Sequence, residues 1–339
     1  MKRLSLSIVL FFMIMLPAHL LAQDAPLKVV TTTTLIADVA RNVGGDLVDV
    51  TALVPVNSDV HAFQAAPQDA VLIGEAQLVL VNGANLEETL LNLVVNAASV
   101  DLTVVSNGVP VLAFADPAGP AALATDSHEP VGRLGVDAEC GSEDEQAEAD
   151  QTQEGSDAQP HGACDPHVWL NPENVAIWAD NIAAAFSAAD ASHAETYAAN
   201  AAAYNAQLAA LDQEIVTIFA AVPADQRILV TNHDFLGYLA AHYDFQIVGT
   251  VIPSLSTLAE PSPQDVADLI NAIHTTGVKA VFAEVSNPNA LAKVIAQDAG
   301  DVAVVILFSD SLSGPDEAAP TYLDYMRYNA QAIADALAS

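Results

Sequence analysis

Short apolar runs rich in β-branched residues alternate with Ala-rich stretches through two separate halves of the 339-residue chain. Such alternation is typical of βα units that build parallel sheets. The runs that predict strands are 28–33, 48–54, 78–82 and 102–106 in the first half, and 228–231, 246–251, 279–285 and 302–308 in the second. The pattern therefore predicts an α/β fold of two lobes, each with a four-stranded parallel sheet flanked by helices. No residue-level repeat relates the two halves, so the predicted duplication is architectural.

The stretch between the two halves predicts long helices and no flexible linker. Segments 172–189 and 192–222 are dominated by Ala and contain no internal Gly or Pro. Asn171 before Pro172 is typical of an N-cap followed by Pro at the first helical position. A helix of about 30 residues would span about 45 Å, which is enough to run along both lobes. We expect an N-terminal lobe over 27–171, connecting helices over 172–222 and a C-terminal lobe over 223–339, with the lobes held rigidly.

The first 22 residues have the features of a secretory signal peptide. Lys2 and Arg3 precede the apolar run 4–17, and Ala22 offers a cleavage point before polar residues. The apolar run is shorter than the roughly 20 residues that a bilayer requires. No Cys directly follows it to carry a lipid. We therefore expect a mature chain in a periplasmic or otherwise extracytoplasmic space, monomeric and not inserted in the membrane.

The charge of the chain limits its partners. The formal net charge is −34, and it becomes −36 after loss of residues 1–22, with 43 acidic against 7 basic residues. Such a chain repels phosphate backbones and anionic lipids, so nucleic acid is excluded as a partner and cations are favoured.

An acidic segment interrupts the α/β pattern. Residues 138–160 carry eight carboxylates, no base and no aliphatic side chain larger than Ala. We expect a flexible loop over 117–163, because such a composition cannot form a core. Cys140 and Cys164 lie at or near its ends and are compatible with one disulfide in an oxidising compartment. His128 and His161 lie near it.

Four dispersed residues are candidates for metal ligands: His61, His167, His233 and Asp310. Three of them follow predicted strands, and in open α/β sheets ligands gather at the carboxyl ends of strands. Three imidazoles with one carboxylate suit Zn²⁺ better than Mg²⁺ or Ca²⁺, which prefer oxygen ligands. Their spacing forms no local metal motif. Each histidine taken alone is also consistent with a hydrogen-bonded residue in a loop.

The motifs around these residues resemble the zinc and manganese receptors of ABC importers. The resemblance is carried by Asp165-Pro166-His167-Val168-Trp169-Leu170, by His61 before Phe63, by His233-Asp234-Phe235 with Tyr238, and by Ser309-Asp310-Ser311. It covers the chain from Lys28 to the C-terminus. It implies a metal site made of His61, His167, His233 and Asp310, a rigid helix between the lobes, and delivery of the metal to a membrane permease and its ATPase.

The resemblance also bears on the metal. Members with His at the third ligand position tend to handle zinc, and those with Glu there tend to handle manganese, so His233 indicates Zn²⁺, with Mn²⁺ or Fe²⁺ as alternatives. An acidic insertion before the second ligand is likewise a feature of zinc members. Here it holds few histidines, so His128 and His161 remain only candidate accessory ligands.

One further carboxylate and two further functions deserve testing. Glu284, at the end of the strand 279–285, is expected to accept a hydrogen bond from a ligand imidazole and fix its tautomer. A zinc hydrolase is an alternative, because three ligands and a water form a catalytic zinc site, but Asp310 as a fourth ligand argues against it. A surface adhesin or metal buffer is another.

Overall fold

The computed structural model describes residues 25–87, 90–100, 102–112, 123–124, 164–286, 290–300 and 302–338. The predicted signal peptide, His128, Cys140 and His161 lie outside these residues, so the cleavage, the accessory ligands and the Cys140–Cys164 pairing stay predictions. Among the described helices, none combines the length and apolar character needed to cross a membrane.

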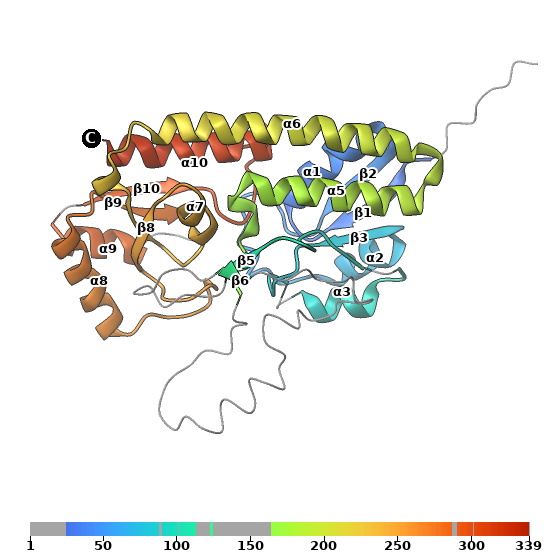
Figure 1. Ribbon diagram of the computed structural model, residues 1–339. Coiled ribbons are helices and arrows are strands. Elements are labelled where there is room, and N and C mark those ends of the chain that lie inside the picture. The colour runs from blue at the N-terminus through green and yellow to red at the C-terminus, as the bar shows by residue number, and fades with distance from the viewer. Residues whose placement is uncertain are drawn as a thin grey trace, which may run out of the picture.

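The first lobe is a parallel sheet with the strand order β2-β1-β3-β4. Its strands are β1 (Leu27–Thr31), β2 (Val48–Ala52), β3 (Leu78–Val81) and β4 (Leu102–Val104). The helices between them are α1 (Thr34–Gly44), α2 (Pro67–Glu75) and α3 (Leu91–Ala97), with a 3₁₀ turn at Gly45–Leu47 (Figure 1). After β4 the chain forms β5 (Val111–Leu112), which pairs antiparallel with β6 (Leu123–Ala124).

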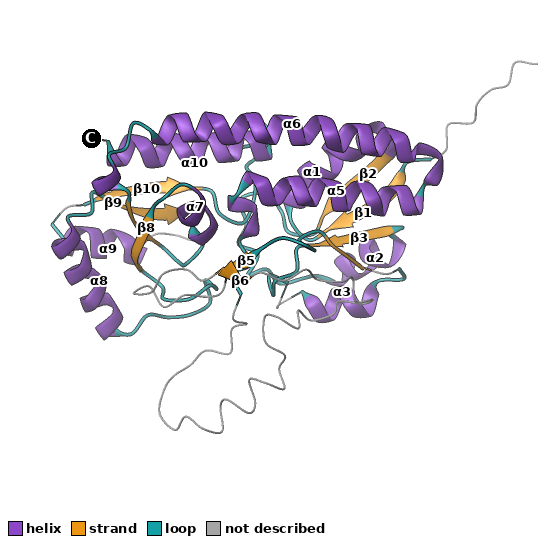
Figure 2. Ribbon diagram, viewed as in Figure 1, coloured by secondary structure: helices purple, strands orange, loops and turns teal. Residues whose placement is uncertain are grey.

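The second lobe repeats this architecture with the order β10-β9-β7-β8, and its strands are also parallel. They are β7 (Ile228–Thr231), β8 (Gln246–Thr250), β9 (Ala280–Glu284) and β10 (Ala303–Leu307). The helices between them are α7 (Gly237–His242), α8 (Pro263–Thr276) and α9 (Ala290–Asp298) (Figure 2). Within each lobe the second strand lies outside the first and the fourth outside the third. The predicted α/β fold of two four-stranded parallel sheets is confirmed.

The duplication extends to individual hydrogen bonds. The Thr31 hydroxyl donates to the carbonyl of Thr33 at 2.9 Å, and the Thr231 hydroxyl donates to the carbonyl of His233 at 2.6 Å. Thr33 and His233 are therefore equivalent positions after the first strand of each lobe. Thr33 caps helix α1 by accepting from the backbone N–H of Ile36, whereas His233 is free of that role and lies near the other candidate ligands.

Two long helices follow the first lobe in the chain, and the longer one links the two lobes, as predicted. They are α5 (Pro172–Ala189) and α6 (Ala194–Phe219), separated by a 3₁₀ turn at Ala191–His193. The Asn171 side chain caps α5 by accepting from the N–H of Glu173. Helix α6 has 26 residues, hence a length of about 39 Å, and it lies along both lobes (Figure 1). It begins later than the sequence predicted because Asp190 holds the His193 ring at 2.6 Å in the turn.

The C-terminal helix α10 (Tyr322–Leu337) packs against α6 and completes a shared core. One buried apolar cluster extends from Val29 in β1 through Trp178 in α5 and Leu208 in α6 to Tyr325 in α10. A smaller cluster lies around α8 and α9 in the second lobe. Because the large cluster includes residues of both lobes, separating the lobes would expose its apolar surface to water. The connection is therefore rigid.

Candidate metal centre

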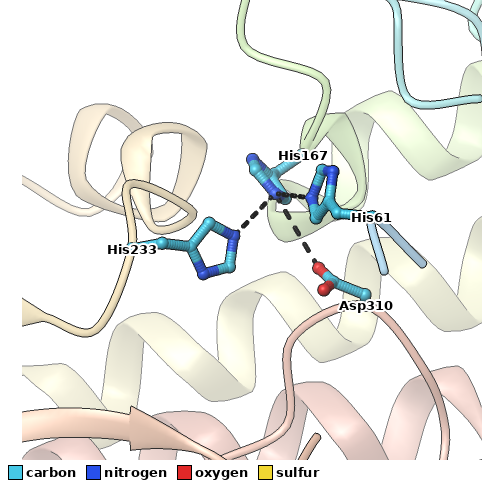
Figure 3. Close-up of side chains that lie close together, drawn as sticks. All are labelled: His61, His167, His233 and Asp310. Atoms are coloured by element: carbon cyan, nitrogen blue, oxygen red, sulfur yellow. Dashed lines mark hydrogen bonds and ion pairs between the residues drawn. The ribbon is translucent and has the colours of Figure 1, made fainter. Parts of the chain in front are cut away.

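The structure brings the four candidate ligands together between the lobes (Figure 3). His61 lies in the loop between β2 and α2, His167 lies directly before the 3₁₀ turn Val168–Leu170, His233 follows β7, and Asp310 follows β10. The Nε2 atom of His167 is 3.4 Å from Nε2 of His61 and 3.2 Å from Nε2 of His233. It is 3.8 Å from Oδ1 of Asp310. One potential ligand atom from each residue lies within 4.8 Å of all the others.

This spacing fits a tetrahedral ion. Bonds of 2.0–2.1 Å to nitrogen and oxygen place ligand atoms about 3.4 Å apart in tetrahedral coordination. The side chains of His167, His233 and Asp310 are fully buried, and His61 is 7 % exposed. Within the described part of the chain, neither carboxylate oxygen of Asp310 has a hydrogen-bond partner. Because an unpartnered buried carboxylate is costly, a cation is the partner that this arrangement lacks.

Burial also raises the pKa of Asp310 well above its ordinary value, although the positive charge of His233 opposes the shift. The negative charges of Glu284 and Asp59 add to the rise. A bound cation would reverse this preference and keep the carboxylate ionised.

Asp165 orients His167. Its Oδ1 atom lies 2.7 Å from Nδ1 of His167 and also accepts from the backbone N–H of that residue at 2.9 Å. Because Nδ1 is occupied, Nε2 is left to face the centre. Burial lowers the pKa of His167 well below its usual range, and the nearby positive charge of His233 adds to this, so the ring is neutral and able to bind a metal. Gly237 lies against Asp165, where a β-carbon would collide with the carboxylate.

Glu284 orients His233, as the sequence led us to expect. Its Oε1 atom lies 2.7 Å from Nδ1 of His233, while Asn232 and the Ser309 hydroxyl donate to the same carboxylate at 3.0 and 2.6 Å. Burial alone would lower the pKa of His233, but the charge and hydrogen bond of Glu284 outweigh it and raise this pKa to about 9. Burial would raise the pKa of Glu284, but His233 lowers it to about 2. The pair is therefore an ion pair when no metal is bound.

Three aromatic residues form hydrogen bonds beside the site, and this group, which we call the floor, consists of Trp169, Tyr322 and Tyr325. The Trp169 indole N–H donates to the carbonyl of Ser309 at 3.1 Å, and the Tyr325 hydroxyl donates to the same carbonyl at 2.7 Å. The Tyr322 hydroxyl donates to the carbonyl of Trp169 at 2.7 Å. The Trp169–Ser309 bond joins a residue two positions after His167 in the first lobe to the residue before Asp310 in the second.

Sequence reasoning missed two kinds of residue. The motif around His167 contains Asp165 but does not by itself reveal its role, although an acidic residue two positions before a ligand histidine is a usable signal. Nothing in the sequence indicates the role of Trp169, because its hydrogen-bond partner, Ser309, lies 140 residues further along the chain. His193 and His242 lie elsewhere, paired with Asp190 and Asp212.

A buried cluster of three histidines and one carboxylate, between two rigidly joined α/β lobes, defines the class of metal-binding solute receptors of ABC importers. The family model described as "Zinc-uptake complex component A periplasmic" matches residues 29–336. The chain belongs to this family, whose members are extracytoplasmic transport components. The resemblance found in the sequence is thereby confirmed.

Individual relatives agree on the class and differ in the metal that they are named for. An iron-binding protein of Yersinia pestis is 30 % identical over 307 residues, covering 91 % of this chain and 85 % of the relative. A manganese transporter lipoprotein of Streptococcus pneumoniae is 29 % identical, covering 92 % and 89 %.

Two solved structures extend the comparison. The manganese-bound periplasmic protein of Candidatus Liberibacter asiaticus has a TM-score of 0.71 at 26 % identity, covering 92 % of this chain and 99 % of that one. The periplasmic zinc-binding protein of Treponema pallidum has a TM-score of 0.74 at 23 % identity, covering 93 % and 100 %, and supports the fold.

Proposed function

We propose that this protein captures Zn²⁺ between His61, His167, His233 and Asp310 and hands it to an ABC permease. The observation that carries the proposal is the convergence of three imidazoles and one buried carboxylate without a hydrogen-bond partner, whose ligand atoms all lie within 4.8 Å of one another. Each of two ligand imidazoles also has a carboxylate on its far nitrogen, an arrangement that is frequent around zinc.

The donor set favours zinc over manganese. Mn²⁺ prefers oxygen ligands, whereas imidazole suits Zn²⁺ well. His233 supplies a nitrogen at the position where Glu would supply an oxygen and a negative charge. A fourth protein ligand also disfavours a catalytic site, which keeps one position open for water. We therefore propose capture and release without a chemical step.

A manganese or iron receptor is the second candidate. The pneumococcal and Yersinia relatives are named for manganese and iron, and the Liberibacter structure is manganese-bound. These relatives cover nearly the whole chain, so their metals are realistic competitors.

Competition titrations of the mature chain with Zn²⁺, Mn²⁺ and Fe²⁺ separate the two candidates. We expect zinc to be bound at least about 100-fold more tightly than manganese, in line with the order of stability for nitrogen-rich sites. Because most protein sites bind zinc more tightly than manganese, a His233→Glu variant is needed as the matched control. In the His233→Glu variant, the difference between the affinities for zinc and for manganese should be smaller than in the wild type. Tighter binding of manganese by the wild type would overturn the zinc assignment.

A further inference from the structure

The loop that carries His61 is fastened to the opposite lobe. This loop connects β2 and α2 in the first lobe, yet its backbone N–H groups at Asn57 and Ser58 donate to residues beyond β10. The partners are the Leu312 carbonyl at 3.0 Å and the Ser311 hydroxyl at 3.1 Å. The Thr257 hydroxyl, in the loop between β8 and α8, donates to Oδ2 of Asp59 at 2.6 Å. The position of His61 thus depends on contacts with the second lobe.

The two carboxylate oxygens of Asp59 accept hydrogen bonds from different parts of the protein. Its Oδ1 atom accepts from the backbone N–H groups of His61 at 2.9 Å and Ala62 at 3.3 Å. Its Oδ2 atom accepts from Thr257, 198 residues further along the chain. One carboxylate therefore fixes the backbone of a candidate ligand and holds the second lobe.

The other candidate ligands are held by different contacts. Asp165 and Glu284 hold the rings of His167 and His233, and the Trp169–Ser309 bond fixes the floor next to Asp310. His61 is the least buried of the four, at 7 % exposed against 0 % for the others. Thr257 belongs to the same loop as Ser254, whose carbonyl accepts from the N–H of Asp234 at 2.9 Å. The Asp59–Thr257 bond thus links the surroundings of His61 to those of His233.

We propose that Asp59 is a positioning residue and that its hydrogen bond with Thr257 is a latch on the metal site. The latch holds His61 in the ligand position, and its opening precedes loss of the ion. The inference rests on metal capture by the proposed site, but it is independent of which ion is captured.

Metal dissociation measures the latch directly. The mature chain and its Thr257→Val variant are loaded with Zn²⁺, and release into excess chelator is followed by stopped flow, with Mn²⁺ as a second probe. Valine removes the hydroxyl with little change of volume. A hydrogen bond to a charged group contributes enough to slow release by about tenfold, so the variant should release zinc about tenfold faster. Association should change far less than release, and the metal-free chain should keep a single cooperative unfolding transition, lowered only by the loss of this one hydrogen bond.

Three controls separate a latch from a general loss of structure. Thr257→Ser keeps the hydroxyl and should restore slow release. Thr275→Val, which removes a helix-surface hydroxyl bonded to Asn271 on α8, should release zinc like the wild type. In an Asp59→Ala background, Thr257→Val should have no further effect, because the two residues act as one unit.

Unchanged dissociation from Thr257→Val, with wild-type binding intact, would overturn the latch alone. Additive effects of Asp59→Ala and Thr257→Val would also overturn it. Wild-type protein that retained neither ion would refute metal capture and the latch together.

Discussion

Replacing Glu284 by Gln tests how the centre competes with protons. The substitution keeps the shape of the side chain and an oxygen that can accept from Nδ1 of His233, but it removes a fully buried negative charge 2.7 Å from that nitrogen. In the wild type this charge raises the pKa of His233 to about 9. Without it, burial dominates, and we expect this pKa to fall to its ordinary value of 6.5 or below.

The direction of the change in metal affinity with pH follows from the protonation state in which His233 binds metal. His233 must lose its Nε2 proton to become a ligand, so protons compete with the ion at every pH below about 9. Each pH unit is equivalent to about 1.36 kcal/mol, so lowering the pH from 9 to 7 weakens wild-type binding by about 2.7 kcal/mol, or about 100-fold. At pH 9, loss of the carboxylate should weaken binding by about 10–100-fold. At pH 7 the Glu284→Gln variant should nearly equal the wild type.

The assay is a chelator competition titration of Zn²⁺ at intervals from pH 7 to pH 9. Calorimetry in buffers of different ionisation enthalpy counts the protons released on binding. The wild type should release up to about one more proton than Glu284→Gln at pH 7, since His233 is protonated in the metal-free wild type and largely neutral in the variant. Equal pH slopes for the two proteins would refute the assignment of the displaced proton to the His233–Glu284 pair.

Four further outcomes are expected. Asp310→Asn should abolish tight zinc binding, because a neutral amide replaces the only candidate carboxylate ligand among the four residues; a hydrolase that used Asp310 as its base would instead keep zinc and lose turnover. Trp169→Phe should lose about 1 kcal/mol of stability and weaken zinc binding, since the bond to Ser309 disappears; unchanged affinity would exclude a role of the floor in holding the ligands. Asn171→Ala should cost about 1 kcal/mol through loss of the α5 cap, with zinc affinity preserved. Zinc at 1,000 times its dissociation constant should stabilise the wild type by about 4 kcal/mol in denaturant unfolding, and His167→Ala should lose this gain.

The strands and connecting helices could be predicted because they follow from local patterns. The strand around Val281 is buried on both faces, as expected for a parallel strand, and the runs around Val29 and Val281 each yield a strand within two residues of its predicted bounds. Helix α5 begins and ends where the Asn171-Pro172 cap and the Asp190 break predicted. The start of α6 was less accurate, since it depends on the contacts of Asp190 with His193 and Tyr197.

The candidate site could be predicted in part. His61, His167, His233 and Asp310 were recognised from their place after predicted strands and from motifs, and the structure brings all four together. The contacts of Asp59 with Thr257 and of Trp169 with Ser309 could not be inferred, because each joins residues far apart in sequence and no local pattern announces the partner.

The sequence by itself determined the two α/β halves, the helical connection and the chemical types of the candidate ligands. These depend on periodicity, capping residues and the donor atoms of each side chain, all of which are local properties. Only the tertiary structure decided which ring nitrogen faces the centre, which imidazole is charged, and how the His61 loop is held. These depend on burial and on carboxylates brought within about 3 Å by packing. Asp165 thus orients a neutral His167, while Glu284 keeps a proton on His233.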